Sequence, residues 1–181
     1  MAEIKDYIWI VPLIGGILAL GAFFAPAAYV ETGGTYFYLW MWALVSSQAW
    51  TSPGILIRRV EFLDNPDILI PSIILSVIIF LCILALIGSS LLYRKRIRNG
   101  KVNPIVWLGA SICILGSTIA WIIIMETVMF PSFWSIMNPG FGVIGMFIGS
   151  ILSIIGYGGA KISMKQKREP IQLPLKEYQS Q

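Results

Sequence analysis

The sequence predicts an all-α membrane protein, a four-transmembrane-helix bundle that carries a small β-hairpin-like first outer loop. Of the 181 residues, 57% are hydrophobic and only 12% are charged, whereas a soluble domain carries about 25% charged residues. The apolar residues fall into four long blocks, and most basic residues fall into the segments on one side of those blocks. Too little polar surface remains to cover a water-soluble particle of this size.

Each of the four blocks is long enough to cross a bilayer as a helix. A block of at least 24 residues makes about 36 Å of helix, which exceeds a hydrocarbon core of about 30 Å. The first block contains Ala25-Pro26-Ala27, which has the form of a signal-peptide cleavage site, but its apolar stretch is longer than that of a usual signal peptide. We therefore expect four spans, at about residues 7–30, 68–93, 104–129 and 140–164.

The basic residues predict the orientation of these spans. Eleven of the thirteen lie in the leader, in the loop between spans two and three, or in the tail, and only Arg58 and Arg59 lie between spans one and two. By the positive-inside rule the first three segments are cytoplasmic, which predicts a multi-pass protein of the cell membrane with both termini in the cytoplasm. The cations of the middle loop are also compatible with contacts to anionic lipid headgroups; they are Arg94, Lys95, Arg96, Arg98 and Lys101.

A stripe of small residues in the fourth block predicts close helix packing, because small side chains let helix backbones approach each other in lipid. Shorter small faces occur at Gly15 and Ala19 in the first block and at Gly116 and Ala120 in the third. We expect these faces to meet inside the bundle, the alternative being a seam between two protomers. The stripe consists of Gly142, Gly145, Gly149, Ser153 and Gly156.

The outer loop, residues 31–67, is predicted to form a hairpin. Its aromatic residues alternate, so a strand over 35–45 would place them on one face. A second strand is expected over 55–63, beyond the turn signal Pro53-Gly54. The alternative is an amphipathic helix from Tyr36 to Ser47, because short apolar runs are ambiguous by period. Exposed aromatic and arginine side chains are typical of protein contacts, so the candidate partner-binding residues are Tyr36, Tyr38, Trp40, Trp42, Arg58 and Arg59.

Two short motifs stand near the start of this loop, Leu39-Trp40-Met41-Trp42-Ala43-Leu44 and Pro26-Ala27-Ala28-Tyr29-Val30. Together with the four-span plan they resemble the claudin and peripheral-myelin-protein-like tetraspan superfamily. Members of that superfamily have cytoplasmic termini and a β-rich first outer loop with a Gly-Leu-Trp signature. The resemblance implies a non-enzymatic, claudin-like interaction protein. Claudins carry a cysteine pair after the signature and this loop has no cysteine, so neither the disulfide nor a barrier or pore function is implied.

Catalytic and metal chemistry have few candidate residues. The chain has no histidine, and Cys82 and Cys113 lie within spans, where a cysteine is usually a small apolar packing residue. One acid, Glu126, lies near the outer end of span three and is expected to reach water or to pair with Arg58 or Arg59. We predict no enzyme activity, no cofactor, no metal site and no nucleic-acid partner.

These observations favour a tetraspan protein whose aromatic outer loop mediates protein–protein or cell-surface interaction, or serves as an accessory subunit of a membrane complex. The expected partners are the lipid bilayer and another membrane protein or a second copy of the chain. We expect the helical domain over residues 1–164 and a disordered cytoplasmic tail over 165–181. The alternative is a small channel or transporter component, for which the spans offer mainly hydroxyl groups, notably Ser89, Ser90, Ser111, Ser117 and Thr118.

Overall fold

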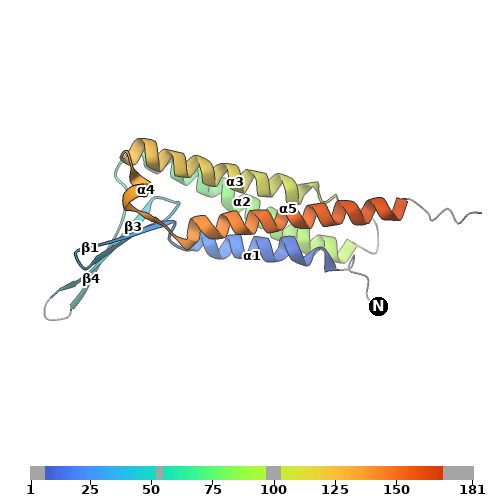
Figure 1. The fold of residues 1–181 in the computed structure, drawn as a ribbon, viewed down its shortest axis with the longest axis horizontal. Coiled ribbons are helices and arrows are strands. Elements are labelled where there is room, and N and C mark those ends of the chain that lie inside the picture. The colour runs from blue at the N-terminus through green and yellow to red at the C-terminus, as the bar shows by residue number, and fades with distance from the viewer. Residues whose placement is uncertain (1–6, 52–54, 97–102, 169–181) are drawn as a thin grey trace, which may run out of the picture.

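The computed structural model describes residues 7–51, 55–96 and 103–168. It is mostly helical, with one five-stranded antiparallel sheet. The long helices lie side by side, the sheet stands at one end of them, and the first turn of the first helix lies at the other end (Figure 1). The expectation of a mainly helical chain is therefore confirmed, but the expected small hairpin is a five-stranded sheet. Three helices are long and apolar enough to cross a membrane.

The first helix is shorter than the expected span over 7–30. Helix α1 runs from Ile10 to Phe24, only 15 residues. A proline disfavours helical backbone in the residue before it, and Ala25, which precedes Pro26, is extended with φ −90° and ψ 155°. The apolar residues after Pro26 enter a β-strand, so apolar composition alone overestimated the length of this helix.

The other three expected spans correspond to long helices. Helix α2 runs from Pro66 to Arg96, α3 from Ile105 to Ile124, and α5 from Phe141 to Arg168. A single π-helical turn, η3, continues α3 from Met125 to Met129. Since α5 continues to Arg168, the tail begins later than the expected residue 165, and residues 169–181 lie outside the described residues.

The sheet has the strand order β4-β3-β2-β1-β5. Strands β1 and β2 are joined by Gly33 and Gly34, whose φ angles of 58° and 77° are typical of a type I′ hairpin turn. The strands are β1 (Ala28–Thr32), β2 (Thr35–Leu39), β3 (Leu44–Thr51), β4 (Ile55–Phe62) and β5 (Asn138–Pro139).

The predicted strand over 35–45 is divided in two. The chain turns between Trp40 and Ala43, where the Ala43 amide donates to the Trp40 carbonyl at 3.0 Å and Ala43 has a φ of 61°. Strands β3 and β4 flank the predicted turn at Pro53-Gly54, which itself lies outside the described residues. The alternative of a helix from Tyr36 to Ser47 is wrong, because this segment forms most of β2 and the first half of β3.

Short elements tie the segment between α3 and α5 to the sheet. The short helix α4 runs from Phe133 to Ile136 and is followed by β5, which pairs with β1 at Ala28 and Tyr29. The amide of Gly140 donates to the Ala27 carbonyl at 2.7 Å. The sheet is thus joined at its β1–β5 side to the end of α1 and to the start of α5.

Two apolar clusters fill the bundle. The larger joins the helices to the base of the sheet, and it includes Trp121, Met125, Phe133, Leu39 and Met41. The smaller, near the opposite end, contains Leu86, Trp107, Ala110 and Ala160. On the outside of the helices large aliphatic side chains are exposed, a pattern that suits contact with lipid; on α2 they include Ile70, Ile73, Ile74, Val77 and Leu81.

Candidate functional site

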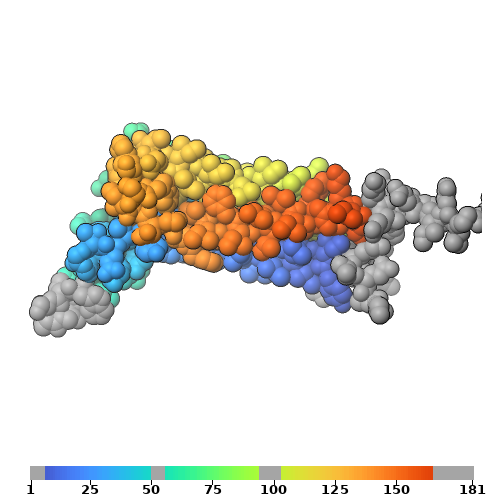
Figure 2. All heavy atoms as spheres, viewed as in Figure 1, coloured from blue at the N-terminus to red at the C-terminus, as the bar shows by residue number. Residues whose placement is uncertain are grey.

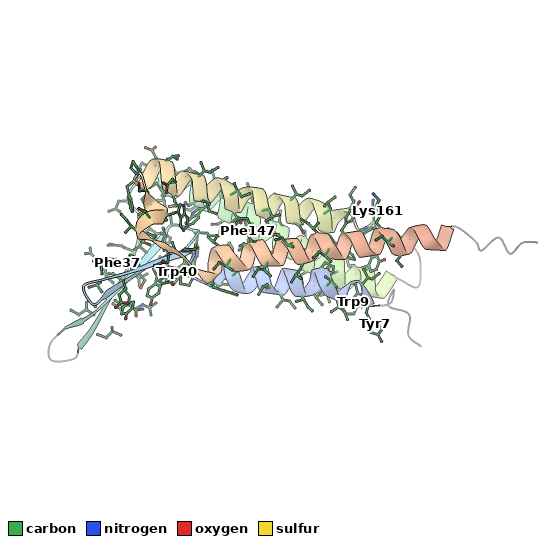
Figure 3. The ribbon with its side chains drawn as sticks, viewed as in Figure 1. Tyr7, Trp9, Phe37, Trp40, Phe147 and Lys161 are labelled. Atoms are coloured by element: carbon green, nitrogen blue, oxygen red, sulfur yellow. The ribbon has the colours of Figure 1, made fainter. Side chains whose placement is uncertain are left out.

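The candidate site is the sheet at the end of the bundle. Phe37 and Trp40 lie there, while Tyr7, Trp9 and Lys161 lie at the opposite end (Figure 3). The two ends of the bundle therefore differ in structure: one carries folded β-structure and the other carries helix ends. The residues of the sheet fall into an anchored part next to the helices and an exposed part along β4.

The two tryptophans predicted to bind a partner instead join the sheet to α1. The indole N–H of Trp40 donates to the Phe24 carbonyl at 2.9 Å, which satisfies an acceptor left free at the end of the helix. The ring of Trp42 stacks on Phe23, with centroids 6.5 Å apart and planes inclined by 14°. Both tryptophans are half-buried, so the expected single exposed aromatic face is not formed.

The two tyrosines of that predicted face lie on β2 and are also half-buried. Tyr36 is directly opposite Glu31 in the pairing of β1 with β2. A hydrogen bond between the Tyr36 hydroxyl and the Glu31 carboxylate raises the pKa of Tyr36, and the negative charge of Glu31 adds to the effect. Tyr38 lies near Trp40, with ring centroids 6.4 Å apart. These side chains connect neighbouring strands rather than stand free in solvent.

The most exposed part of the sheet is β4, an edge strand that contains Arg58 and Arg59. Every residue from Leu56 to Phe62 is exposed. Arg59 pairs with Glu61 at 3.1 Å through side chains that are 75% and 54% exposed, so water strongly screens this pair. The sequence predicted a strand here but missed its apolar members as site residues, because the edge position follows from strand order; they are Leu56, Ile57, Val60 and Phe62.

An apolar groove separates the sheet from the segment that follows α3. It has a volume of about 290 Å³. Side chains of β1, β2 and β3 form one wall, and residues 129–137 form the other. This segment therefore covers one face of the sheet only in part. The groove is lined by residues that include Val30, Phe37, Val45, Met129, Phe130 and Ile136.

The small-residue stripe of α5 lies against α1, and the two helices are in contact along the bundle (Figure 2). A Cβ atom on Gly145 would lie 2.7 Å from Ala22 Cβ, and one on Gly156 would lie 2.5 Å from Pro12 Cδ. The backbones therefore approach too closely for larger side chains. Gly149 and Ser153 make the same kind of approach to α1 at Gly15 and Ala19, and Gly142 makes it to the segment just after α1, residues 25–27.

The small face expected on the third span does not join this contact. Gly116 is exposed, and a Cβ atom on it would have nothing within 4 Å. Helix α3 packs on α2 and α5 through larger buried residues such as Trp107, Ile114 and Trp121. The seam made of small residues is thus formed by two helices, not three.

Glu126 holds the chain reversal after α3. Its two carboxylate oxygens accept hydrogen bonds from the backbone amides of Ser132 and Trp134, at 3.0 and 3.2 Å. The indole N–H of Trp134 donates to the Ile122 carbonyl at 3.3 Å, next to the π-helical turn. The carboxylate of Glu126 thus binds backbone amides, and Arg59, one of its two expected partners, pairs with Glu61 instead.

Hydroxyl groups in the spans are used mainly within their own helices. The hydroxyls of Ser90, Ser111 and Thr118 donate to carbonyls four residues earlier, at 2.6–2.8 Å, and Ser89 donates to the Leu86 carbonyl. Such bonds are the usual role of hydroxyls in spanning helices. Each of these hydroxyls uses its one donor within its own helix, whereas the buried hydroxyls of Ser72, Ser76 and Ser150 have no partner among the described residues.

The remaining predicted residues lie at the end of the bundle away from the sheet or within the spans. Arg94, Lys95 and Arg96 form the end of α2, whereas Arg98 and Lys101 lie outside the described residues. Cys82 and Cys113 are free and half-buried. Within the described ranges no three His, Cys, Asp or Glu residues gather as metal ligands.

Comparison of the chain with protein-family models and with curated proteins finds no match. The claudin-like resemblance, which depends on the segment Leu39–Leu44 and on the four-span plan, therefore stays a prediction.

Proposed function

We propose that this chain is a non-enzymatic, multi-pass membrane protein that binds a partner protein through strand β4 of its outer sheet. The observation that carries the proposal is the exposure of every residue from Leu56 to Phe62 on an edge strand. An exposed edge offers unpaired backbone N–H and C=O groups to another chain. Apolar side chains on the same strand, among them Ile57 at 54% and Phe62 at 52% exposed, add a hydrophobic contribution.

The proposal includes α1 as a fourth span. Its 15 residues give only about 22 Å of helix, less than a hydrocarbon core of about 30 Å. The seam of α1 with α5 nevertheless extends from Pro12 against Gly156 to Ala22 against Gly145. Because α1 packs against α5 over this length, α1 lies at the same depth in the bilayer as α5. Local thinning and interfacial anchors accommodate a short span at modest cost.

The orientation proposed has both termini in the cytoplasm and the sheet outside the cell. Eleven of the thirteen basic residues lie before the first span, between the second and third spans, or at and beyond the end of the fourth, and the positive-inside rule assigns these segments to the cytoplasm. Lys161 lies at that end (Figure 3). A protein with its sheet outside the cell could act at the cell surface or as a subunit of a larger membrane complex.

Accessibility to a membrane-impermeant thiol reagent tests this topology. Tyr7 and Ile57 are equally exposed, at 54% each, and lie at opposite ends of the bundle. In intact cells, Ile57→Cys is expected to react and Tyr7→Cys to react only after permeabilisation, each in a chain in which Cys82 and Cys113 are replaced by alanine. Equal labelling of both variants in intact cells would show that α1 does not cross the membrane.

Site-specific photocrosslinking tests the partner-binding role of β4. A photoreactive residue in place of Val60, which is 49% exposed on β4, is expected to capture a protein in native membranes. The matched position is Ile155, 59% exposed on α5, which is expected to capture lipid instead. The proposal fails if Val60 yields no more protein adduct than Ile155 in correctly inserted protein.

A further inference from the structure

Strand β4 has a regular set of free backbone groups along its outer side. The Leu63 amide donates to the Ala43 carbonyl at 3.0 Å, next to the pairing of Phe62 with Leu44. In an antiparallel ladder, successive residues alternate between those that bond the neighbouring strand and those that face away from it. The backbone groups of Phe62, Val60 and Arg58 therefore face away from β3, toward the open edge.

We propose that the partner of β4 is the same strand of a second copy of this chain, paired antiparallel about a two-fold axis at Val60. This inference rests on the proposed partner-binding role of β4. This pairing of the two β4 strands joins two five-stranded sheets into one continuous sheet. In this register Val60 bonds Val60 of the second copy, and Arg58 bonds Phe62 on each side. These pairs use only groups that face the open edge, and they supply about six backbone hydrogen bonds.

Charge selects this register over its neighbours. With Val60 at the axis, Arg59 lies opposite Glu61 of the second copy, and Glu61 lies opposite Arg59. Opposite charges facing each other across strands are stabilising, and like charges are destabilising. A register centred on Arg58, Arg59 or Glu61 places that residue opposite the same residue of the second copy, so that two like charges face each other. Registers centred nearer either end of the strand leave the charges without an opposite partner.

The side chains of the two faces fit the same arrangement. On one face the existing pair of Arg59 with Glu61 would extend into a group of four alternating charges. On the other face Arg58 would lie opposite Phe62, an arrangement in which a guanidinium can stack on an aromatic ring. The exposed apolar side chain of Val60 would be covered at the axis. The exposed side chains from Arg58 to Phe62 thus each gain a partner from a second copy.

Disulfide trapping in native membranes tests the register, again with Cys82 and Cys113 replaced by alanine. Residues that form a hydrogen-bonded antiparallel pair have Cα atoms about 5.5 Å apart, within the range that a disulfide spans. Under mild oxidation Val60→Cys is expected to give a covalent dimer. Ile57→Cys is the matched control, because this register separates its two copies by six residues, about 20 Å. Equal dimer yields from the two variants, or none from Val60→Cys, would overturn the proposal.

A mixing experiment tests the charge pairing. In Arg59→Glu, positions 59 and 61 are both acidic, and in Glu61→Arg they are both basic. Like charges then face each other across the dimer, so each variant alone is expected to lower the dimer yield about ten-fold. Each variant loses the ion pair between residues 59 and 61 of its own chain. In an equimolar mixture, an acidic chain of one variant can face a basic chain of the other, which restores opposite charges between the two chains. The mixture is therefore expected to recover the heterodimer, and no recovery would contradict the pairing.

If the photoreactive residue at Val60 then captures only a different protein, self-association is excluded while the partner-binding role of β4 remains.

Discussion

Replacing Gly149 by alanine is expected to destabilise the protein by about 2–3 kcal/mol, because overpacking of a tight contact costs about 1–3 kcal/mol and more where the neighbour cannot move. The added Cβ atom would lie 2.5 Å from the Gly15 carbonyl oxygen and 3.1 Å from the Ala19 amide nitrogen. Both neighbours are backbone atoms of a helix, so relief requires α1 and α5 to separate. Thermal unfolding in a mild detergent measures the effect.

Gly158 provides a matched control on the same helix. A Cβ atom there would have nothing within 4 Å, and alanine is a better helix former than glycine by up to about 1 kcal/mol. Gly158→Ala is therefore expected to leave the stability unchanged or to raise it slightly. If the two variants unfold at the same temperature, the close approach of α1 and α5 is not what stabilises the bundle.

Replacing Glu126 by alanine is expected to cost about 2–3 kcal/mol and to loosen the segment after α3. Hydrogen bonds to a charged group contribute about 1.5–3 kcal/mol each. Because Glu126 is partly exposed, its two hydrogen bonds together contribute less than the sum of these values. The amides of Ser132 and Trp134 lose their acceptors, so their hydrogen exchange is expected to accelerate.

Amide exchange separates a local effect from a general loss of stability. Protection at Ser132 and Trp134 is expected to fall in Glu126→Ala, whereas protection in the middle of α5, at Ser150, is expected to persist. In Glu126→Gln one carbonyl oxygen remains as an acceptor, and an intermediate result is expected. Unchanged exchange at Ser132 and Trp134 in the alanine variant would contradict the role assigned to the carboxylate.

Apolar length in the sequence predicts three helices of the fold well, because an uninterrupted apolar block in α2, α3 or α5 has no competing structure. It fails at the end of α1, where the block continues past Pro26 but the backbone changes to a strand. Alternation of aromatic residues likewise predicts β2 but not its end at Leu39. The turn between Trp40 and Ala43 depends on tertiary contacts, among them the bond from Trp40 to the Phe24 carbonyl.

The candidate site was only partly accessible to sequence reasoning. Arg58 and Arg59 were identified by their type, and they lie on the exposed strand. Their apolar neighbours were not identified, since edge and central strands have similar local patterns and differ in the order of pairing. The partners of Glu126 were missed for a similar reason, because the chain reversal that presents the amides of Ser132 and Trp134 follows a π-helical turn that no residue pattern marked.

The close seam between α1 and α5 has a consequence for the biosynthesis of the protein. During synthesis α1 is made before α2 and α3, and α5 is made after them, yet α1 packs most extensively on α5. The small face around Gly15 and Ala19 therefore remains uncovered while the middle helices enter the bilayer. A chain stopped before α5 would contain α1, α2 and α3 in an open bundle, which membrane quality control could distinguish from the finished protein. Completion of the last helix is thus the step that closes the fold.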